Sequence, residues 1–539
     1  MKHAVGSPRP CILSLPHHAE ASSKLDLMKT VALLVSLLGV AAFSVAAKDP
    51  QRPNILFIYA DDQSYKTLSC YPEAFAGVKT PNIDALAKTG VRFRGAYLGS
   101  WCMPSRATML TGRQPHAIES MSMAGAYPGS TYDPKQAPFI PAQMRQQGYQ
   151  TAQIGKWHTG TDSGWGRDWD YQIVWNRPKH PENAGAYYER QILSFNGEER
   201  WQDGYPADNY TKWACEYIKG ANRDAEKPWY LWLCYGNIHG PNTPAERHAV
   251  HYAKLEIPIP SDIFGPRPGK PAYLDKTQAW VRGADGQPYA GKNGGEQVGD
   301  SATAPKGKNK LGMPFLEWAR RVNECVLPLD EGVGQLMAAL KQSGQLENTF
   351  VVYTADQGFA MGEHGFRAKL APYDANYRSP LIVSMPSRFP TNAVCNASVT
   401  GADLAATFLA ISGVKVPWAI HGRDITPLLQ KRDAPASQPC FYEHMGQRYG
   451  KDVKGILDGA SDQGGDKNFP AYVAVVQDGF KLIHYLVREH GEELYDLGAD
   501  AAELKNLIGD PAQSKRIAKL RAALIAECKR TEAPFELQP

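Results

Sequence analysis

The sequence predicts an α/β protein with a large, mostly parallel sheet flanked by helices, followed by a smaller C-terminal α+β domain with an antiparallel sheet. Four short apolar runs lack the polar alternation of half-exposed strands, as expected for strands that are buried on both faces of a parallel sheet. These runs are residues 54–60, 149–154, 228–235 and 348–355. Near the C-terminus, residues 472–477 and 481–487 are joined through Asp-Gly, which is typical of a β-hairpin.

The chain of 539 residues is too long for one small core, and its 43% apolar and 21% charged content is ordinary for a globular protein. Pro-rich breaks in the periodicity predict a large domain over residues 48–415 and a C-terminal subdomain over 416–539. Residues 284–311, rich in Gly, Lys and Asn, are interpreted either as a solvated, flexible basic insertion or as a basic loop that guides an anionic polymer. Residues 315–342 are expected to form one helix.

The N-terminal segment is typical of a targeting sequence. Residues 28–47 combine a basic start, a short apolar core and small residues before a cleavage point after Ala47, which predicts a signal peptide rather than a membrane anchor. Residues 1–27 then reflect a mis-assigned upstream start. We therefore expect an exported protein, periplasmic or secreted, whose mature chain carries no membrane span.

Charge and cysteine content exclude some classes of function. The net charge of +4 is too weak to imply a nucleic-acid partner, and no zinc-type cysteine spacing is present. Of the nine cysteines, Cys11 precedes the mature chain and Cys102 is considered for chemistry below. The remaining seven are widely spaced, and their pairing in an exported protein stays open.

Each of the four apolar runs ends in ionisable or amide side chains. Because ligand sites in open α/β sheets form beyond the carboxyl ends of the strands, one shared site would explain all four endings; unrelated turns are the alternative. The residues concerned are Asp61, Asp62, Lys156, His158, His239, Asp356 and Gln357. Asp61, Asp62, Asp356 and Gln357 offer only oxygen ligands, which suit Ca²⁺ or Mg²⁺ better than zinc.

Cys102, Pro104 and Arg106 form a C-x-P-x-R pattern. Pro104 suits the first turn of a helix and Gly112 its far end, so that Cys102 would lie just before a helix N-terminus that favours an anion. The alternative is a buried, inert cysteine.

The pattern, extended by Ala-Thr-x-Leu-Thr-Gly-Arg, resembles the signature of the type I sulfatases of the alkaline phosphatase superfamily, and three further blocks match in the same order between residues 52 and 507. The resemblance implies an alkaline-phosphatase-like fold, a bound Ca²⁺, and a Cys102 that joins the metal ligands after oxidation to formylglycine (3-oxoalanine). It also implies a formylglycine-generating or sulfatase-maturing enzyme as partner. Gln357 departs from the family, which more often has Asn there.

The resemblance also implies a role for each site residue. Arg106 steadies the formylglycine, Lys156 contacts the sulfate, and His158 is the base that collapses the sulfated diol. His239 and Lys369 hold the sulfate and protonate the leaving oxygen, while His364 supports substrate binding.

Residues 361–381 most resemble the iduronate-2-sulfatase and choline-sulfatase branch and some galactan sulfatases. We therefore expect a sulfated polysaccharide or glycosaminoglycan fragment as substrate. The tryptophans Trp165, Trp169 and Trp175 are either core aromatics or platforms for sugar rings. The alternatives are a phosphonate monoester or phosphodiester hydrolase, a non-catalytic glycan-binding relative, and a cysteine hydrolase that uses Cys102 with His158 or His239.

Overall fold

The computed structural model describes residues 52–118, 121–123, 130–132, 138–292, 311–367, 369–431, 438–446, 449–457, 469–487 and 490–537. The chain divides into two units, Met1–Gln51 and Arg52–Pro539, and all described residues belong to the second. The expected upstream segment 1–27, the signal peptide 28–47 and most of the insertion 284–311 lie outside the described residues. Within the described part, no helix combines the length and the apolar character that a bilayer crossing requires.

The centre of the fold is an eleven-stranded sheet in which β12, β1, β9, β5 and β6 run parallel to one another. Every residue of β1 is buried, because both faces of the sheet are covered. The four apolar runs are thus confirmed as strands, although β5 extends past the predicted end to Trp157 and so includes Lys156. The bounds are β1 Asn54–Ala60, β5 Gln150–Trp157, β6 Tyr171–Asn176, β9 Trp229–Cys234 and β12 Thr349–Ala355.

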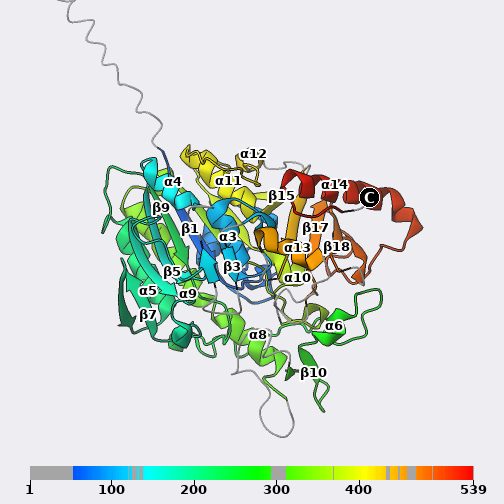
Figure 1. The fold of residues 1–539 in the computed structure, drawn as a ribbon. Coiled ribbons are helices and arrows are strands. Elements are labelled where there is room, and N and C mark those ends of the chain that lie inside the picture. Colours follow the sequence, from blue (N-terminus) through cyan, green and yellow to red (C-terminus); the bar gives the residue numbers. More distant parts are fainter. Residues whose placement is uncertain are drawn as a thin grey trace, which may run out of the picture. The chain divides into compact units, whose positions relative to one another are not determined.

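Both edges of the sheet carry antiparallel strands, which makes the sheet mixed (Figure 1). On one edge β14 and β2 follow β12, and β15 pairs parallel to β2; on the other edge the hairpin β7–β8 follows β6. The bounds are β2 Val91–Tyr97, β7 Gln191–Phe195, β8 Glu198–Gln202, β13 Arg378–Ser379, β14 Leu381–Ser384 and β15 Ala393–Thr400.

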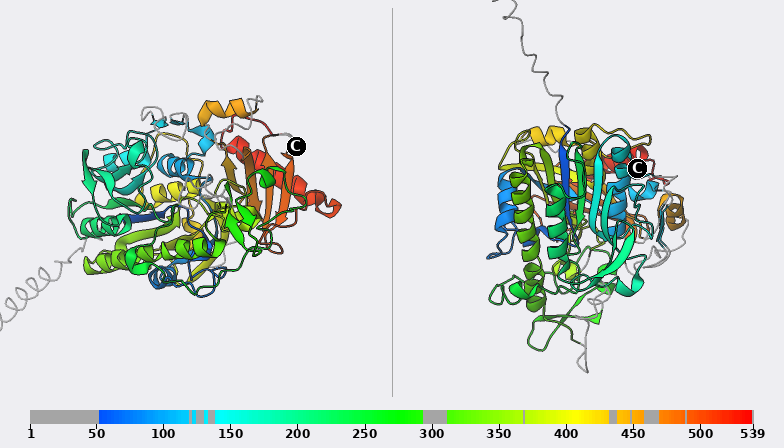
Figure 2. Two further views of the ribbon diagram at one scale, coloured as in Figure 1. Left: turned by 90° about the horizontal axis from the view of Figure 1, so that it is seen from below. Right: turned by 90° about the vertical axis from the view of Figure 1, so that its left-hand side faces the viewer.

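Helices cover both faces of the sheet, seen in the left view of Figure 2. Alternate residues of β1 point to opposite sides: Leu56 and Ile58 pack with one group of helices, whereas Ile55 and Phe57 pack with the other. The first group is α2 Pro81–Lys88, α5 Pro206–Ile218, α8 Phe315–Glu324 and α9 Leu327–Gln342; the second is α3 Cys102–Thr111, α4 Ile140–Gln146 and α11 Gly401–Ser412.

The prediction of a single helix over residues 315–342 is wrong. The chain forms α8 and α9 instead, because Pro328 lacks a backbone N–H and therefore favours the start of a new helix.

A four-stranded antiparallel sheet follows, with α14 beside it in Figure 1. Asp478 and Gly479 both have positive φ, as a two-residue hairpin turn between β17 and β18 requires, so the predicted hairpin is confirmed. A buried ion pair between His116 Nδ1 and Glu443 Oε2, 2.6 Å apart, links this sheet to the segment that follows α3. The bounds are β16 Cys440–His444, β17 Tyr472–Gln477, β18 Phe480–Tyr485, β19 Glu492–Asp496 and α14 Ser514–Arg530.

The remaining elements are short: β3 Met121–Met123, β4 Ser130–Tyr132, β10 Trp280–Arg282, β11 Pro288–Ala290, α6 Tyr273–Lys276, α10 Asp374–Tyr377, α12 Thr426–Gln430 and α13 Lys454–Leu457. The domain boundary at residues 415/416 stays a prediction. None of the eight cysteines within the described residues forms a disulfide.

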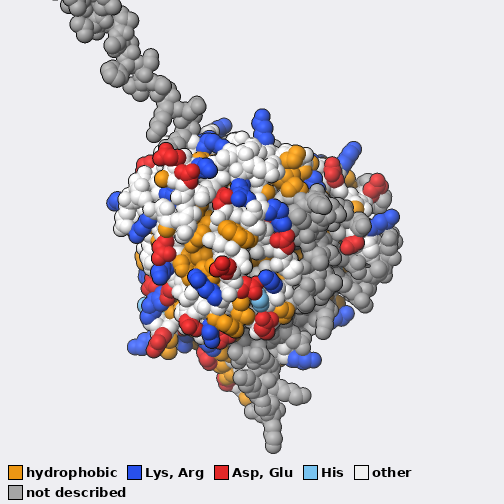
Figure 3. Space-filling view, turned by 60° about the vertical axis from the view of Figure 1, so that its left-hand side comes forward, with side chains coloured by type: hydrophobic (Ala, Val, Ile, Leu, Met, Phe, Trp, Pro, Cys, Tyr) orange, Lys and Arg blue, Asp and Glu red, His pale blue; other side chains and the backbone are white. Residues whose placement is uncertain are grey.

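The three tryptophans divide into two kinds. Trp169 and Trp175 are fully buried core residues, whereas 40% of the surface of Trp165 is exposed. On the face shown in Figure 3, acidic and basic side chains are interspersed with apolar patches, in keeping with the small net charge of +4.

Candidate active site

The carboxyl ends of β1 and β12 and the start of α3 meet in one buried cluster. One carboxylate oxygen each of Asp61, Asp62 and Asp356 and the Cys102 sulfur all lie within 4.8 Å of one another. Asp61 and Asp62 follow β1, and Asp356 follows the neighbouring β12, so the parallel pairing of these strands places the three carboxylates at the same edge. The structure therefore brings together the residues that the strand-end pattern predicted.

Each carboxylate has its own buried cationic partner. Lys156 pairs with Asp61, Lys369 Nζ lies 2.7 Å from Asp62 Oδ1, and Arg106 Nη2 lies 3.1 Å from Asp356 Oδ2. Such pairing is required because an unpaired charge in a buried site is strongly destabilising. Three separate segments thus supply the positive charge: β5, α3 and the loop that follows β12.

The three carboxyl groups differ in their affinity for a proton. Burial alone would raise the pKa of Asp61, but Lys156 and His239 hold it well below its usual range. Burial and the negative charge of Asp61 raise the pKa of Asp356 to about 8. Three carboxylates thus face three cationic partners, and burial still favours a proton on Asp356.

Cys102 is the first residue of α3, rather than the residue just before the helix as expected, and Gly112 ends the helix with a φ of 71°. Its Sγ lies 3.3 Å from Asp61 Oδ1 and 3.2 Å from Lys369 Nζ. Burial, and next the charge of Asp61, raise the pKa of the thiol to about 12. Because the thiolate is the reactive form, this environment argues against a cysteine hydrolase.

His239 follows β9 and faces the cluster. Its Nε2 lies 3.6 Å from Asp62 Oδ2, and its Nδ1 contacts the carbonyl oxygen of Gly240 at 2.9 Å. A carbonyl oxygen can only accept, so Nδ1 carries a proton and Nε2 points toward Asp62. Burial and the charge of Lys369 hold the pKa of His239 well below its ordinary value.

His158 is positioned by Arg177, whose Nη1 lies 3.3 Å from His158 Nδ1. Burial and the Arg177 charge hold the pKa of His158 well below its ordinary value, so the ring is neutral. Because a guanidinium can only donate, the neutral ring carries its proton on Nε2. The role of His158 as a base would require this contact to be released, and it stays a prediction.

Sequence reasoning missed Arg177 and Tyr187. The Tyr187 ring stacks on His239 with centroids 4.1 Å apart and planes inclined by 4°, and Lys156 and Arg177 both lie over the Tyr187 ring. Arg177 directly follows β6, and the strand-end rule did not find it because β6 was not among the predicted strands. Tyr187 lies outside any helix or strand, and no sequence signal identifies it.

The side-chain oxygen of Gln357 lacks a hydrogen-bond partner among the described residues, as expected for a metal ligand. The Gln357 side chain is fully buried, and its Nε2 contacts Asp62. Rotation of the amide by 180° would turn that oxygen toward the carboxylates. The donor set is then four side-chain oxygens and residue 102, which suits Ca²⁺.

His364 contacts a carboxylate outside the cluster, that of Asp262. Its Nδ1 is 2.7 Å from Asp262 Oδ2, and its ring centroid is 4.3 Å from that of Tyr373. Burial and the charge of Lys270 lower the pKa of His364 to about 4. Its supporting role in substrate binding stays a prediction.

Comparison with known proteins identifies the class of this site. The model of the sulfatase family matches residues 53–414. An N-acetylglucosamine-6-O-sulfatase of Bacteroides thetaiotaomicron is 28% identical over 95% of this chain and 93% of its own length.

Two solved structures are also similar. A protein in complex with its substrate D-glucosamine-2-N,6-O-disulfate superimposes with a TM-score of 0.74 at 26% identity, and the match covers 90% of this chain and 99% of the other. A phosphonate monoester hydrolase of Agrobacterium radiobacter shares the fold, with a TM-score of 0.60 at 20% identity over 90% of this chain and 100% of the other. With the family model matched over most of its length, the chain belongs to the sulfatase family and is a sulfuric ester hydrolase.

Proposed function

We propose that the protein removes sulfate from carbohydrates, with a formylglycine at position 102 and a Ca²⁺ held by Asp61, Asp62, Asp356 and Gln357. The observation that carries this proposal is the buried cluster of three carboxylates and Cys102 within 4.8 Å, bordered by two lysines and a histidine. A bound Ca²⁺ would draw the sulfate oxygens into place. The hydrated aldehyde of formylglycine would supply a hydroxyl nucleophile for sulfur.

The residues of the chain supply the rest of the chemistry. Lys369 Nζ lies 3.2 Å from Cys102 Sγ, and the neighbouring Asp62 helps to raise its pKa well above the ordinary value despite burial. Lys369 therefore enters the reaction as an ammonium group that can hold sulfate and donate a proton to the leaving oxygen. Lys156, fully buried and paired with Asp61, supplies a second positive charge for the sulfate.

Arg106 acts through the groups around it. Its guanidinium contacts Asp356 Oδ2 and the carbonyl oxygen of Lys156, and it lies over the ring of Tyr59. It thereby fixes one carboxylate of the proposed metal site and the backbone that carries Lys156. Tyr187 likewise fixes the plane of His239 by stacking on it.

We propose a 6-O-sulfated glucosamine unit as the sulfated ring. The support comes from two comparisons: one match is named an N-acetylglucosamine-6-O-sulfatase, and one solved structure is bound to D-glucosamine-2-N,6-O-disulfate. The test is kcat/KM on N-acetylglucosamine 6-O-sulfate beside its 3-O- and 4-O-sulfated isomers. Equal rates on all three isomers would contradict the assignment.

Mass spectrometry tests the nucleophile. Conversion of Cys102 to formylglycine lowers the mass of its peptide by roughly 18 Da, whereas a cysteine enzyme keeps its thiol. The protein should be produced together with a formylglycine-generating enzyme, and the Cys102→Ala variant, which cannot be converted, should be inactive with an unchanged melting temperature. Activity of a preparation whose residue 102 is wholly unmodified would overturn the proposal.

A phosphonate monoester hydrolase is the second candidate, because this fold is shared with such an enzyme. Paired assays with an aryl sulfate and an aryl phosphonate separate the two. We expect the larger kcat/KM for the sulfate.

We also propose that the mature protein is exported. The support is the signal-like segment 28–47, whose small residues precede a cleavage point after Ala47. N-terminal sequencing of the protein from its native host should begin at Lys48. A mature chain that still begins at Met1 or Met28 would contradict this proposal.

A further inference from the structure

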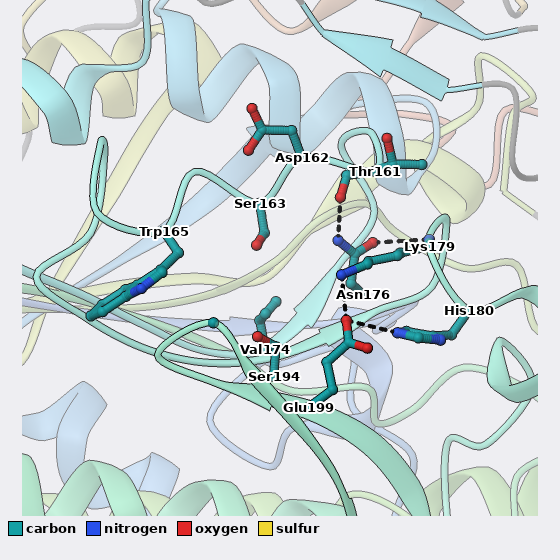
Figure 4. Close-up of a pocket in the computed structure, with 11 residues that line it drawn as sticks. Thr161, Asp162, Ser163, Trp165, Val174, Asn176, Lys179, His180, Ser194 and Glu199 are labelled. Carbon is teal, nitrogen blue, oxygen red and sulfur yellow. Dashed lines mark hydrogen bonds and ion pairs between the residues drawn. The ribbon is translucent and has the colours of Figure 1, made fainter.

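A cavity lies between the loop that follows β5 and the hairpin β7–β8. Its volume is about 260 Å³. Figure 4 shows Trp165 at one side of this cavity and Lys179 and His180 at the other. The mechanism proposed above uses none of the side chains that line it.

Trp165 forms an apolar wall. It exposes 40% of its surface, whereas Trp169 and Trp175 nearby in sequence are fully buried. The ring rests on the β7–β8 turn: a Cβ atom on Gly197 would lie 2.8 Å from Trp165 Cδ1, so only glycine leaves room for the indole. A large aromatic side chain held in this way at the edge of a cavity is typical of a binding site, because burial of its exposed surface by a ligand is favourable.

The polar wall opposite is electrically balanced. Glu199 pairs with Lys179, and its Oε1 lies 3.1 Å from His180 Nε2. Asp162 pairs with Arg167 at 2.6 Å. Because each of these charges has an opposite partner, the cavity offers hydrogen-bond donors and acceptors without a net charge that would favour a second anion.

These groups remain accessible to a ligand. The side chains of Lys179, Glu199 and Asp162 are 51%, 32% and 49% exposed. Asn176 is buried and fixed, since its amide donates to the carbonyl oxygen of Thr161 at 2.7 Å. An aromatic wall facing carboxylate, ammonium and imidazole groups matches a ring with an apolar face and several hydroxyl groups.

The segments that line the cavity also carry residues of the active site. Thr161, which lines it, follows His158 by three residues, and three residues span at most about 11 Å. On the neighbouring strand, Asn176 lines the cavity while the adjacent Arg177 contacts His158 Nδ1. A saccharide chain with its sulfated ring in the active site could therefore place another ring here.

We infer that this cavity is a subsite for an uncharged sugar ring of the substrate chain, with Trp165 as its stacking platform. The inference rests on the proposed function as a carbohydrate sulfatase and adds a position that selects for chain length and for a neutral neighbouring ring.

The test compares Trp165→Ala with Trp201→Ala, a matched control on β8 that is 50% exposed and does not line the cavity. The two substrates are N-acetylglucosamine 6-O-sulfate and a tetrasaccharide in which the same sulfated ring is linked to uncharged galactose. We expect Trp165→Ala to lower kcat/KM for the tetrasaccharide by about tenfold, with less than a twofold change for the monosaccharide. Trp201→Ala should leave both values unchanged. Equal losses on both substrates, or no loss on either, would overturn the inference.

Failure of the proposed function gives a different result. If the wild-type protein hydrolyses neither substrate, the carbohydrate sulfatase assignment fails. Calorimetric titration with the unsulfated tetrasaccharide then tests separately whether the cavity binds sugar. Binding to the wild type that Trp165→Ala abolishes and Trp201→Ala preserves would support a sugar site at this cavity. Absence of binding to the wild type would refute it.

Discussion

Removal of calcium should destabilise the folded protein by an amount that the carboxylate cluster determines. A cation that binds only the folded state stabilises it by RT ln(1 + [L]/Kd), which is about 2.7 kcal/mol at a free concentration one hundred times Kd. Asp61, Asp62 and Asp356 are all buried and adjacent, and they come together only when β1 pairs with β12. The unfolded chain therefore has no comparable site.

The expected change in melting temperature follows from the size of the protein. The unit Arg52–Pro539 has roughly 490 residues and hence an unfolding entropy of about 1.0 kcal/mol/K. A stabilisation of about 2.7 kcal/mol then raises Tm by about 3 °C. Asp62→Asn removes one ligand charge and should weaken Ca²⁺ binding. If Kd rises a hundredfold, the stabilisation by Ca²⁺ falls to about 0.4 kcal/mol and the change in Tm to below about 1 °C.

Differential scanning calorimetry with excess Ca²⁺ and with EDTA measures both shifts. Asp203→Asn, which removes a carboxylate whose side chain is 85% exposed, is the control and should behave as the wild type. An identical Tm for the wild type in the two buffers would refute the calcium site. A shift of equal size in Asp62→Asn would show that the cation binds elsewhere.

Three further predictions concern buried positions. Gly155→Ala places a Cβ 2.0 Å from a backbone carbonyl oxygen of β9, at a residue whose φ is 105°. Thermal unfolding should show that the free energy of unfolding falls by about 2–4 kcal/mol. Gly166→Ala is the control and should lose less, because no atom lies within 4 Å of its added Cβ. Tyr187→Leu removes the ring stacked on His239, and steady-state kinetics should show kcat lowered about tenfold or more with a near-normal Tm. His116→Gln removes the buried ion pair to β16: burial alone would lower the pKa of His116, but its carboxylate partner raises it overall. The pair therefore stabilises fully below about pH 6.5 and weakens as pH rises through the raised pKa, so the Tm advantage of the wild type over His116→Gln should be larger at pH 6 than at pH 9.

Much of the central sheet could be predicted from the sequence because its strands are buried on both faces. The runs at 54–60, 228–235 and 348–355 show no polar alternation, and β1, β9 and β12 match them to within one residue at each end. β6 was not predicted, because Gln172 interrupts its apolar run and conceals a strand whose residues are all buried. Local periodicity also failed to show that Pro328 separates two helices.

The acidic part of the site was predictable for a geometric reason. Asp61 and Asp356 follow strands that turned out to be parallel neighbours, so their proximity depends only on strand order and direction. Lys369 lies in no helix or strand, and only the family resemblance pointed to it. Trp165 differs again: sequence spacing could not separate it from the buried Trp169 and Trp175, because exposure depends on where the β7–β8 turn packs.

The charges of the site explain why three carboxylates and three cations occupy so small a volume. With Asp61, Asp62 and Asp356 ionised, Lys156, Lys369 and Arg106 balance them, and a divalent cation would then leave a net charge of about +2. That cation would lower the raised pKa of Asp356 and displace its proton, since metal binding competes with protonation of the ligands. A sulfate ester carries one negative charge and free sulfate carries two. A bound substrate ester would therefore leave about one positive charge uncompensated, and this charge would stabilise the negative charge that develops on the leaving oxygen as the ester bond breaks.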